Sequence, residues 1–280
     1  MAVLLGLLSA FAYGTSDFAG GVASRRLAAG PVTGVAQALG MVTAAVAVIL
    51  FHGSGPKTAA LEWGALSGLG SALGTLSLYQ GLSVARMSVV ATLSAVLTAV
   101  IPVIVGIALG NELRVAAAAG VLIAIPAIAM VSWQSQSAER RVARTGPMYG
   151  VLAGLGFALL FIALDQAGTG SGAWPLLPGQ IVSLLLIAPF AYRGLRGSGR
   201  PASSAAALTI GAGVLGGTAN LLFLAATGHG ELAIVAVLTA LYPAITVVLA
   251  RAFLSERWTR VQAVGLVAAA AAITLVTVGR

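Results

Sequence analysis

The chain has 280 residues, of which 59% are hydrophobic and only 8% are charged, and its formal net charge is +8. Soluble domains carry about 25% charged residues, so this chain cannot cover a water-exposed surface and is expected to lie in lipid. The basic residues fall in short loops between apolar runs, a distribution that argues against nucleic-acid binding. Cysteine is absent, which excludes disulfides and thiolate chemistry.

Ten apolar runs are long enough to cross a bilayer core, which takes roughly 20 helical residues. The first run has no basic residue before it and no small-residue cleavage site, so we interpret it as a retained span. The sequence therefore predicts an all-α integral membrane protein. In chain order the predicted spans are 2–22, 32–51, 62–83, 87–109, 115–133, 147–167, 174–192, 204–227, 231–254 and 260–278.

Similar residues recur at a nearly constant offset along the chain. Gly70 and Gly213 are 143 positions apart, and Glu112 and Glu256 are 144 apart. We therefore predict two five-helix repeats, residues 1–140 and 146–280, which together form one membrane domain around a central cavity. Because five is an odd number, the two copies must enter the membrane in opposite orientations, as an inverted repeat.

The basic residues predict the orientation of the chain. Basic residues favour cytoplasmic loops, so the odd-numbered loops are expected in the cytoplasm and both termini outside. Twelve of the 15 Lys and Arg residues lie in or beside odd-numbered loops: Arg25, Arg26, Arg86, Arg140, Arg141, Arg144, Arg193, Arg196, Arg200, Arg251, Arg257 and Arg260.

Asp17 is the most unusual residue of the first span, because apolar and small residues surround it. A carboxylate inside the bilayer costs roughly 2.5–3.5 kcal/mol on insertion scales and marks a functional candidate. Two interpretations stand: it binds a proton or an ammonium group, or it is a helix-end aspartate that accepts bonds from Thr15, Ser16 or nearby backbone. Asp165 lies closer to the end of its span, which favours an interfacial position.

Further polar side chains lie within the predicted spans. Tyrosine hydroxyls and amides suit a zwitterionic or aromatic solute in a low-dielectric cavity, but they also form hydrogen bonds between membrane helices. We favour helix packing for Gln37 and Gln180 and solute binding for Tyr79 and Gln80, while keeping all of them as candidates. With Asp17, the candidate substrate-binding residues are Tyr13, Gln37, Tyr79, Gln80, Gln180 and Asn220.

Pro102 and Pro243 lie in the fourth and ninth predicted spans, where each removes a helical hydrogen bond. They are interpreted either as gating hinges or as residues that only shape the bundle. The sequence shows no nucleophile elbow, no Walker loop and no metal-binding pair. We therefore expect neither an enzyme nor a bound metal or cofactor, and without a nucleotide site any driving energy must come from a solute or ion gradient.

The segment YPAITVVLARAFLSERWTRVQAVGLVAAAAAITLV, residues 242–276, resembles the EamA-type family of the drug/metabolite transporter superfamily. The similarity includes Pro243, the aliphatic run that follows it and Glu256, with Glu112 ending the fourth span of the first half. The resemblance implies a basket of ten helices in the bacterial inner membrane that exports small metabolites, with amino acids, including aromatic and other neutral ones, as the expected substrates.

The leading hypothesis is a secondary transporter that works by alternating access, either as a uniporter or coupled to protons through Asp17. Its expected partners are a small-molecule substrate and the lipid bilayer, with no nucleic acid, and a monomer would suffice for this activity. Three alternatives remain: a non-transporting scaffold or lipid-acting enzyme, a channel, and a multidrug or nucleotide-sugar-like carrier of the same fold. An enzyme would need clustered catalytic residues, and a channel would need rings of like residues from symmetric subunits.

Overall fold

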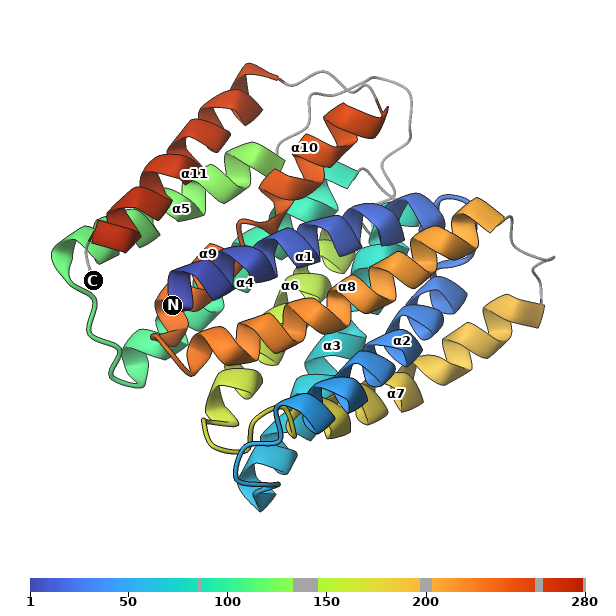
Figure 1. The fold of residues 1–280 in the computed structure, drawn as a ribbon. Helices are drawn as coiled ribbons and strands as arrows, with labels where there is room; N and C mark the ends of the chain where they lie inside the picture. The colour runs from blue at the N-terminus through green and yellow to red at the C-terminus, as the bar shows by residue number, and fades with distance from the viewer. Residues whose placement is uncertain (85–86, 133–145, 197–202, 255–258, 279–280) are drawn as a thin grey trace.

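The computed structural model describes residues 1–84, 87–132, 146–196, 203–254 and 259–278 (Figure 1). This part of the chain is all helical, which confirms the predicted fold class. Most predicted spans correspond to a single helix, with ends that differ by a few residues. The helices are α1 (Ala2–Ser24), α2 (Ala29–Leu50), α3 (Thr58–Val84), α4 (Met87–Ala108), α5 (Val115–Ser132), α6 (Gly146–Gln166), α7 (Leu176–Arg196), α8 (Ser203–Thr227), α9 (Leu232–Thr239), α10 (Tyr242–Leu254) and α11 (Arg260–Val278).

The outer surface of the bundle is apolar, as lipid contact requires. Large hydrophobic side chains are widely exposed on it, for example Ile49 at 74%, Leu122 at 69% and Val267 at 71%. By length and composition, α1, α2, α6, α8 and residues Leu176–Leu195 of α7 can each cross a membrane. The surface therefore matches a bilayer rather than water as its solvent.

The predicted ninth span, 231–254, is not one helix but two. Helix α9 ends at Thr239, and α10 begins at Tyr242 after Ala240 and Leu241. Pro243 lies in the first turn of α10, where a missing backbone N–H disturbs no intrahelical bond. By contrast, Pro102 lies inside α4, which continues through it. The two prolines therefore occupy different structural positions, and their action as hinges stays a prediction.

The main helix contacts join the two predicted halves of the chain. Helix α3 packs on α6 and α7, α1 packs on α8, and α2 packs on α7 and α8. Helices α5 and α11 form a further pair, side by side at one edge of the bundle (Figure 1). The main contacts of the described helices therefore run between the two predicted repeats, whose bounds stay a prediction.

Glycine lets α3 and α6 approach each other closely. A Cβ atom added to Gly156 would lie 2.7 Å from the Cα of Gly74 and 2.8 Å from the carbonyl oxygen of Gly70. Both neighbours are backbone atoms, which cannot rotate away as a side chain can. Small residues allow such close helix packing in membranes, so glycine at this crossing sets the distance between the two helices.

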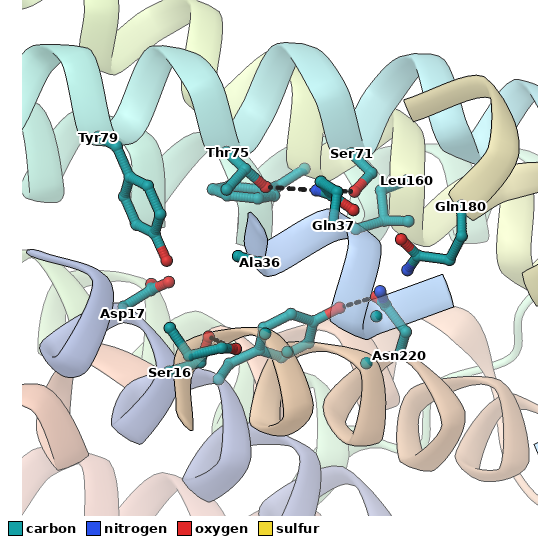
Figure 2. A pocket seen from close by; sticks show the side chains of 17 residues that line it. Ser16, Asp17, Ala36, Gln37, Ser71, Thr75, Tyr79, Leu160, Gln180 and Asn220 are labelled. Carbon is teal, nitrogen blue, oxygen red and sulfur yellow. Dashed lines mark hydrogen bonds between the residues drawn. The ribbon is translucent and has the colours of Figure 1, made fainter. Parts of the chain in front are cut away.

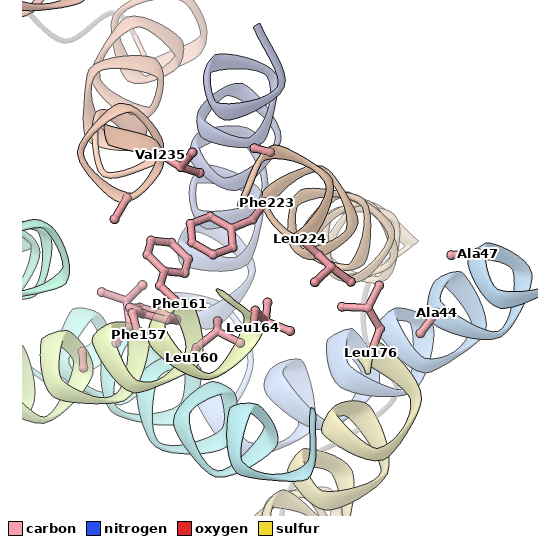
Figure 3. Close-up of a cluster of buried hydrophobic side chains, with 14 of the residues drawn as sticks. Ala44, Ala47, Phe157, Leu160, Phe161, Leu164, Leu176, Phe223, Leu224 and Val235 are labelled. Carbon is pink, nitrogen blue, oxygen red and sulfur yellow. The ribbon is translucent and has the colours of Figure 1, made fainter. Parts of the chain in front are cut away.

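Phe161 of α6 anchors the apolar core between the halves (Figure 3). Its ring stacks on Phe223 of α8, with centroids 4.1 Å apart and planes at 15°. The ring of Tyr13 on α1 packs against Phe161 at 5.8 Å. Phe161 is the residue 144 positions after Asp17, so at this corresponding position the second half carries a buried ring instead of a carboxylate.

Two loops meet at one end of the bundle. The backbone N–H of Ala173 donates to the carbonyl of Phe51 at 2.8 Å, and Ser54 donates through its hydroxyl to the carbonyl of Gly170 at 2.9 Å. In another connection, the side-chain oxygen of Asn111 accepts the backbone N–H of Ala233, at the start of α9, at 3.1 Å. These bonds satisfy backbone groups that helix ends would otherwise leave unpaired.

Candidate functional site

A cavity lies between α1, α2, α3, α6, α7 and α8 (Figure 2). Its empty space is about 460 Å³, including the part that is open at its mouth. The lining residues are Tyr13, Ser16, Asp17, Ala36, Gln37, Gly40, Ser71, Thr75, Tyr79, Phe157, Leu160, Gln180, Ala212, Gly213, Gly216, Gly217 and Asn220.

The cavity brings together six of the seven residues that the sequence indicates as candidates for substrate binding. They come from five helices: α1, α2, α3, α7 and α8. They are Tyr13, Asp17, Gln37, Tyr79, Gln180 and Asn220. The structure therefore gathers into one space polar groups that lie up to 207 positions apart in the chain.

Gln80 is the candidate that does not line the cavity. It follows Tyr79 directly on α3, and successive residues of a helix point about 100° apart because a turn holds 3.6 residues. Since Tyr79 faces the cavity, Gln80 is turned away from it. Its backbone carbonyl accepts the hydroxyl of Ser83 at 2.8 Å.

Ser71 and Thr75 line the cavity although the sequence analysis did not select them. They precede Tyr79 by eight and four residues, so all three lie on one face of α3. The Nε2 group of Gln37 donates to the hydroxyl of Ser71 at 3.0 Å and to that of Thr75 at 3.4 Å. Spacing of four residues between polar side chains in an apolar span is the signal that could have found them.

Tyr13 and Asn220 join α1 to α8 across the cavity wall. The hydroxyl of Tyr13 donates to Oδ1 of Asn220, a bond drawn in Figure 2. Ser16, one turn further along α1, donates to the carbonyl of Ala212 at 2.8 Å. Both bonds hold the polar face of α1 against α8, and Asp17 follows directly after Ser16.

The carboxylate of Asp17 points toward the hydroxyl of Tyr79 (Figure 2). Thr15 donates its hydroxyl to the carbonyl of Phe11 at 2.8 Å, and Ser16 donates to Ala212, so these two hydroxyls are engaged elsewhere. Nearby backbone is therefore the remaining donor for the interpretation of Asp17 as a helix-end aspartate. Among the described residues that line the cavity, Asp17 is the only charged one.

Asp165 lies away from this cavity, at the end of α6. The Nε2 group of Gln166 donates to its Oδ2 at 3.0 Å. The carboxyl group is only partly buried. This position agrees with the interfacial role that the sequence favours for Asp165.

A second, smaller hollow of about 190 Å³ adjoins the cavity. The two share Ser71, Leu160, Gln180 and Asn220 as lining residues. The smaller hollow adds Leu176 and Gly179, near the start of α7, and Leu164, near the end of α6. Hollow space therefore continues from the cavity toward the end of the bundle where the loop segments 51–57 and 167–175 meet.

Comparison with known proteins adds the family. Residues 144–278 match the model of the EamA-like transporter family. No curated protein matches the chain. A solved structure titled only "Crystal structure of protein" has the same fold, with a TM-score of 0.77 over 99% of this chain and 96% of that chain, at 14% sequence identity. Residues 144–278, nearly half of the chain, are therefore similar to the EamA-like transporter family, which confirms the predicted resemblance.

Proposed function

We propose that this protein is a secondary transporter that exports amino acids, aromatic and other neutral ones included, across the bacterial inner membrane by alternating access. The observation that carries the proposal is a single carboxylate, Asp17, inside a cavity otherwise lined by amides, hydroxyls and small residues. The carboxylate of Asp17 can pair with the ammonium group of an amino acid, and the amide N–H groups of the cavity can donate to the carboxylate of that amino acid.

Charge supports this substrate class over anionic ones. No Lys or Arg is found among the described residues that line the cavity. Sites for phosphates and dicarboxylates use basic side chains as partners. A nucleotide-sugar-like substrate would therefore bring its negative charge next to Asp17 without compensation.

The arrangement of the halves supports the proposal of alternating access. We propose that residues 1–140 and 146–280 form an inverted repeat, because exchanging α1 with α6, α2 with α7 and α3 with α8 leaves the main pairs of packed helices unchanged. Such repeats hold the substrate at their interface and rock around it. The cavity is lined by helices of both halves, as this mechanism requires.

Counterflow in proteoliposomes tests the substrate. Vesicles loaded with one unlabelled amino acid should accumulate the same labelled amino acid, and a full panel of amino acids without any exchange would contradict the proposed substrate class. The family assignment to small-solute transporters would be unaffected by that result.

Asp17→Asn tests the coupling role of Asp17. If the carboxyl group binds the coupling proton or the substrate ammonium, the variant should lose the pH dependence of flux or lose flux entirely. Asp165→Asn is the matched control, since it removes the same charge outside the cavity, and it should behave like the wild type. Full pH-dependent flux in Asp17→Asn would contradict the proposed role.

A further inference from the structure

Gln37 and Gln180 occupy corresponding positions in the two halves, 143 residues apart, but their surroundings differ. Gln37 donates to two hydroxyls of α3, on Ser71 and Thr75. The Oε1 atom of Gln180 has no hydrogen-bond partner within the described part of the chain, although Gln180 is only 5% exposed. Buried polar atoms in proteins are nearly always hydrogen-bonded. We therefore expect this acceptor to bind a partner that the described part of the chain does not supply.

The unpaired oxygen faces the space where the two hollows join. Gln180 lines both of them, and its amide points into the cavity in Figure 2. Gly40 of α2 makes room for it, because a Cβ atom at Gly40 would lie 3.0 Å from Oε1. The amide is thus held against α2 with one acceptor free for a molecule in the cavity.

The positions of Tyr79 and Ser71 along helix α3 indicate that Asp17 and Gln180 lie at different depths of the cavity. Tyr79 lies beside Asp17, and Ser71 borders the part of the cavity that Gln180 lines (Figure 2). Eight residues separate the two on α3, which corresponds to about 12 Å at 1.5 Å per residue.

We propose that Gln180 is a second solute-binding residue, which accepts a hydrogen bond from an O–H or N–H group at the far end of an amine bound to Asp17. This inference rests on the proposed function, since it places the solute ammonium at Asp17. It names the ligand class as an elongated amine with a distal hydrogen-bond donor. Phe157 and Leu160, which line the cavity together with these polar groups, offer an apolar wall to the hydrocarbon or ring between the two donors.

Tyramine and phenethylamine are the probes, because they differ only by the phenolic O–H at the end opposite the amine. Binding is measured as the concentration-dependent rise in melting temperature of the full-length protein in detergent. The wild type should bind tyramine about tenfold more tightly, since a site that hydrogen-bonds a hydroxyl disfavours the analogue without it. Equal affinity for the two amines, or no binding of either, overturns the proposal.

Gln180→Leu and the matched variant Gln37→Leu separate binding from folding. Gln180→Leu should bind both amines equally and should be as stable as the wild type without ligand, because it removes an acceptor that has no partner. Gln80→Leu, which lies outside the cavity, should keep the preference for tyramine. Gln37→Leu should melt at a lower temperature than the wild type, because Ser71 and Thr75 lose their donor. A preference that persists in Gln180→Leu, or a loss of stability equal to that of Gln37→Leu, overturns the proposal.

Amino-acid counterflow distinguishes this inference from the proposed function. If tyramine is preferred in a Gln180-dependent way while no amino acid exchanges, the amino-acid substrate class is wrong and the second binding residue stands. If amino acids exchange but tyramine shows no preference over phenethylamine, the transporter proposal stands and the role of Gln180 is wrong.

Discussion

The close crossing of α3 and α6 makes a quantitative prediction for Gly156→Ala. The added methyl group would lie 2.7 Å from the Cα of Gly74 and 2.8 Å from the carbonyl oxygen of Gly70. Since both are backbone atoms, the helices themselves must move apart. Overpacking of this kind costs about 1–3 kcal/mol, while alanine contributes about 0.5–1 kcal/mol over glycine as a helix former.

Gly211→Ala is the matched control, because Gly211 also lies within a helix, α8, and a Cβ atom there meets nothing within 4 Å. The gain in helix propensity is the same in both variants, so their difference isolates the collision. We expect Gly156→Ala to melt roughly 2–12 °C below Gly211→Ala, taking about 2–4 °C per kcal/mol for a chain of this size. The assay is thermal unfolding in detergent followed by tryptophan fluorescence. Equal melting temperatures would show that the backbone contact between α3 and α6 does not limit their packing.

Three further predictions concern the core, a helix start and the orientation of the chain. Phe161→Ala should lower the free energy of unfolding by about 3–5 kcal/mol, because the ring is only 2% exposed. Phe11→Ala, at a ring that is 54% exposed, should change it by about 0.5 kcal/mol or less, and similar losses in the two variants would contradict the assigned core. Asn111→Ala should cost about 0.5–2 kcal/mol by leaving the backbone N–H of Ala233 without its acceptor, whereas the exposed neighbour Glu112→Ala should be neutral in the same melting experiment. In the cysteine-free chain, a membrane-impermeant maleimide should label Ser54→Cys but not Ala28→Cys in intact cells, and labelling of Ala28→Cys alone would reverse the predicted orientation.

The helices could be predicted from the sequence because lipid imposes a strong and simple pattern. Runs of roughly 20 apolar residues separated by charges define each span, and helix ends such as Ser24, Thr227 and Val278 lie within two residues of the expected positions. The break between α9 and α10 could not be predicted in the same way. Residues 232–254 are almost uniformly apolar, so composition does not distinguish two short helices from one long helix.

The candidate site could be predicted in kind but not in detail. A carboxylate or amide in an apolar span must face other helices or a wet space, which identified Asp17, Gln37 and Asn220 as cavity candidates. Whether a side chain faces that space depends on how its helix is rotated about its own axis. The hydropathy pattern of an almost wholly apolar helix does not determine this rotation. Gln80 was therefore selected beside Tyr79, and the difference between Gln37 and Gln180 became visible only from their neighbours.

Because the principal helix contacts run between the halves, the order of synthesis has a consequence for assembly. Helices α1, α2 and α3 are made before α6, α7 and α8, the helices on which they pack. Until those arrive, the polar face of α1 has no α8 against which to lie, and Asp17 meets lipid at a cost of roughly 2.5–3.5 kcal/mol. The remaining apolar residues of α1 must carry that carboxylate into the bilayer alone. Biogenesis therefore limits how many polar groups the first half can contribute. Because the second half is inserted last, additional polar groups are tolerated more easily there.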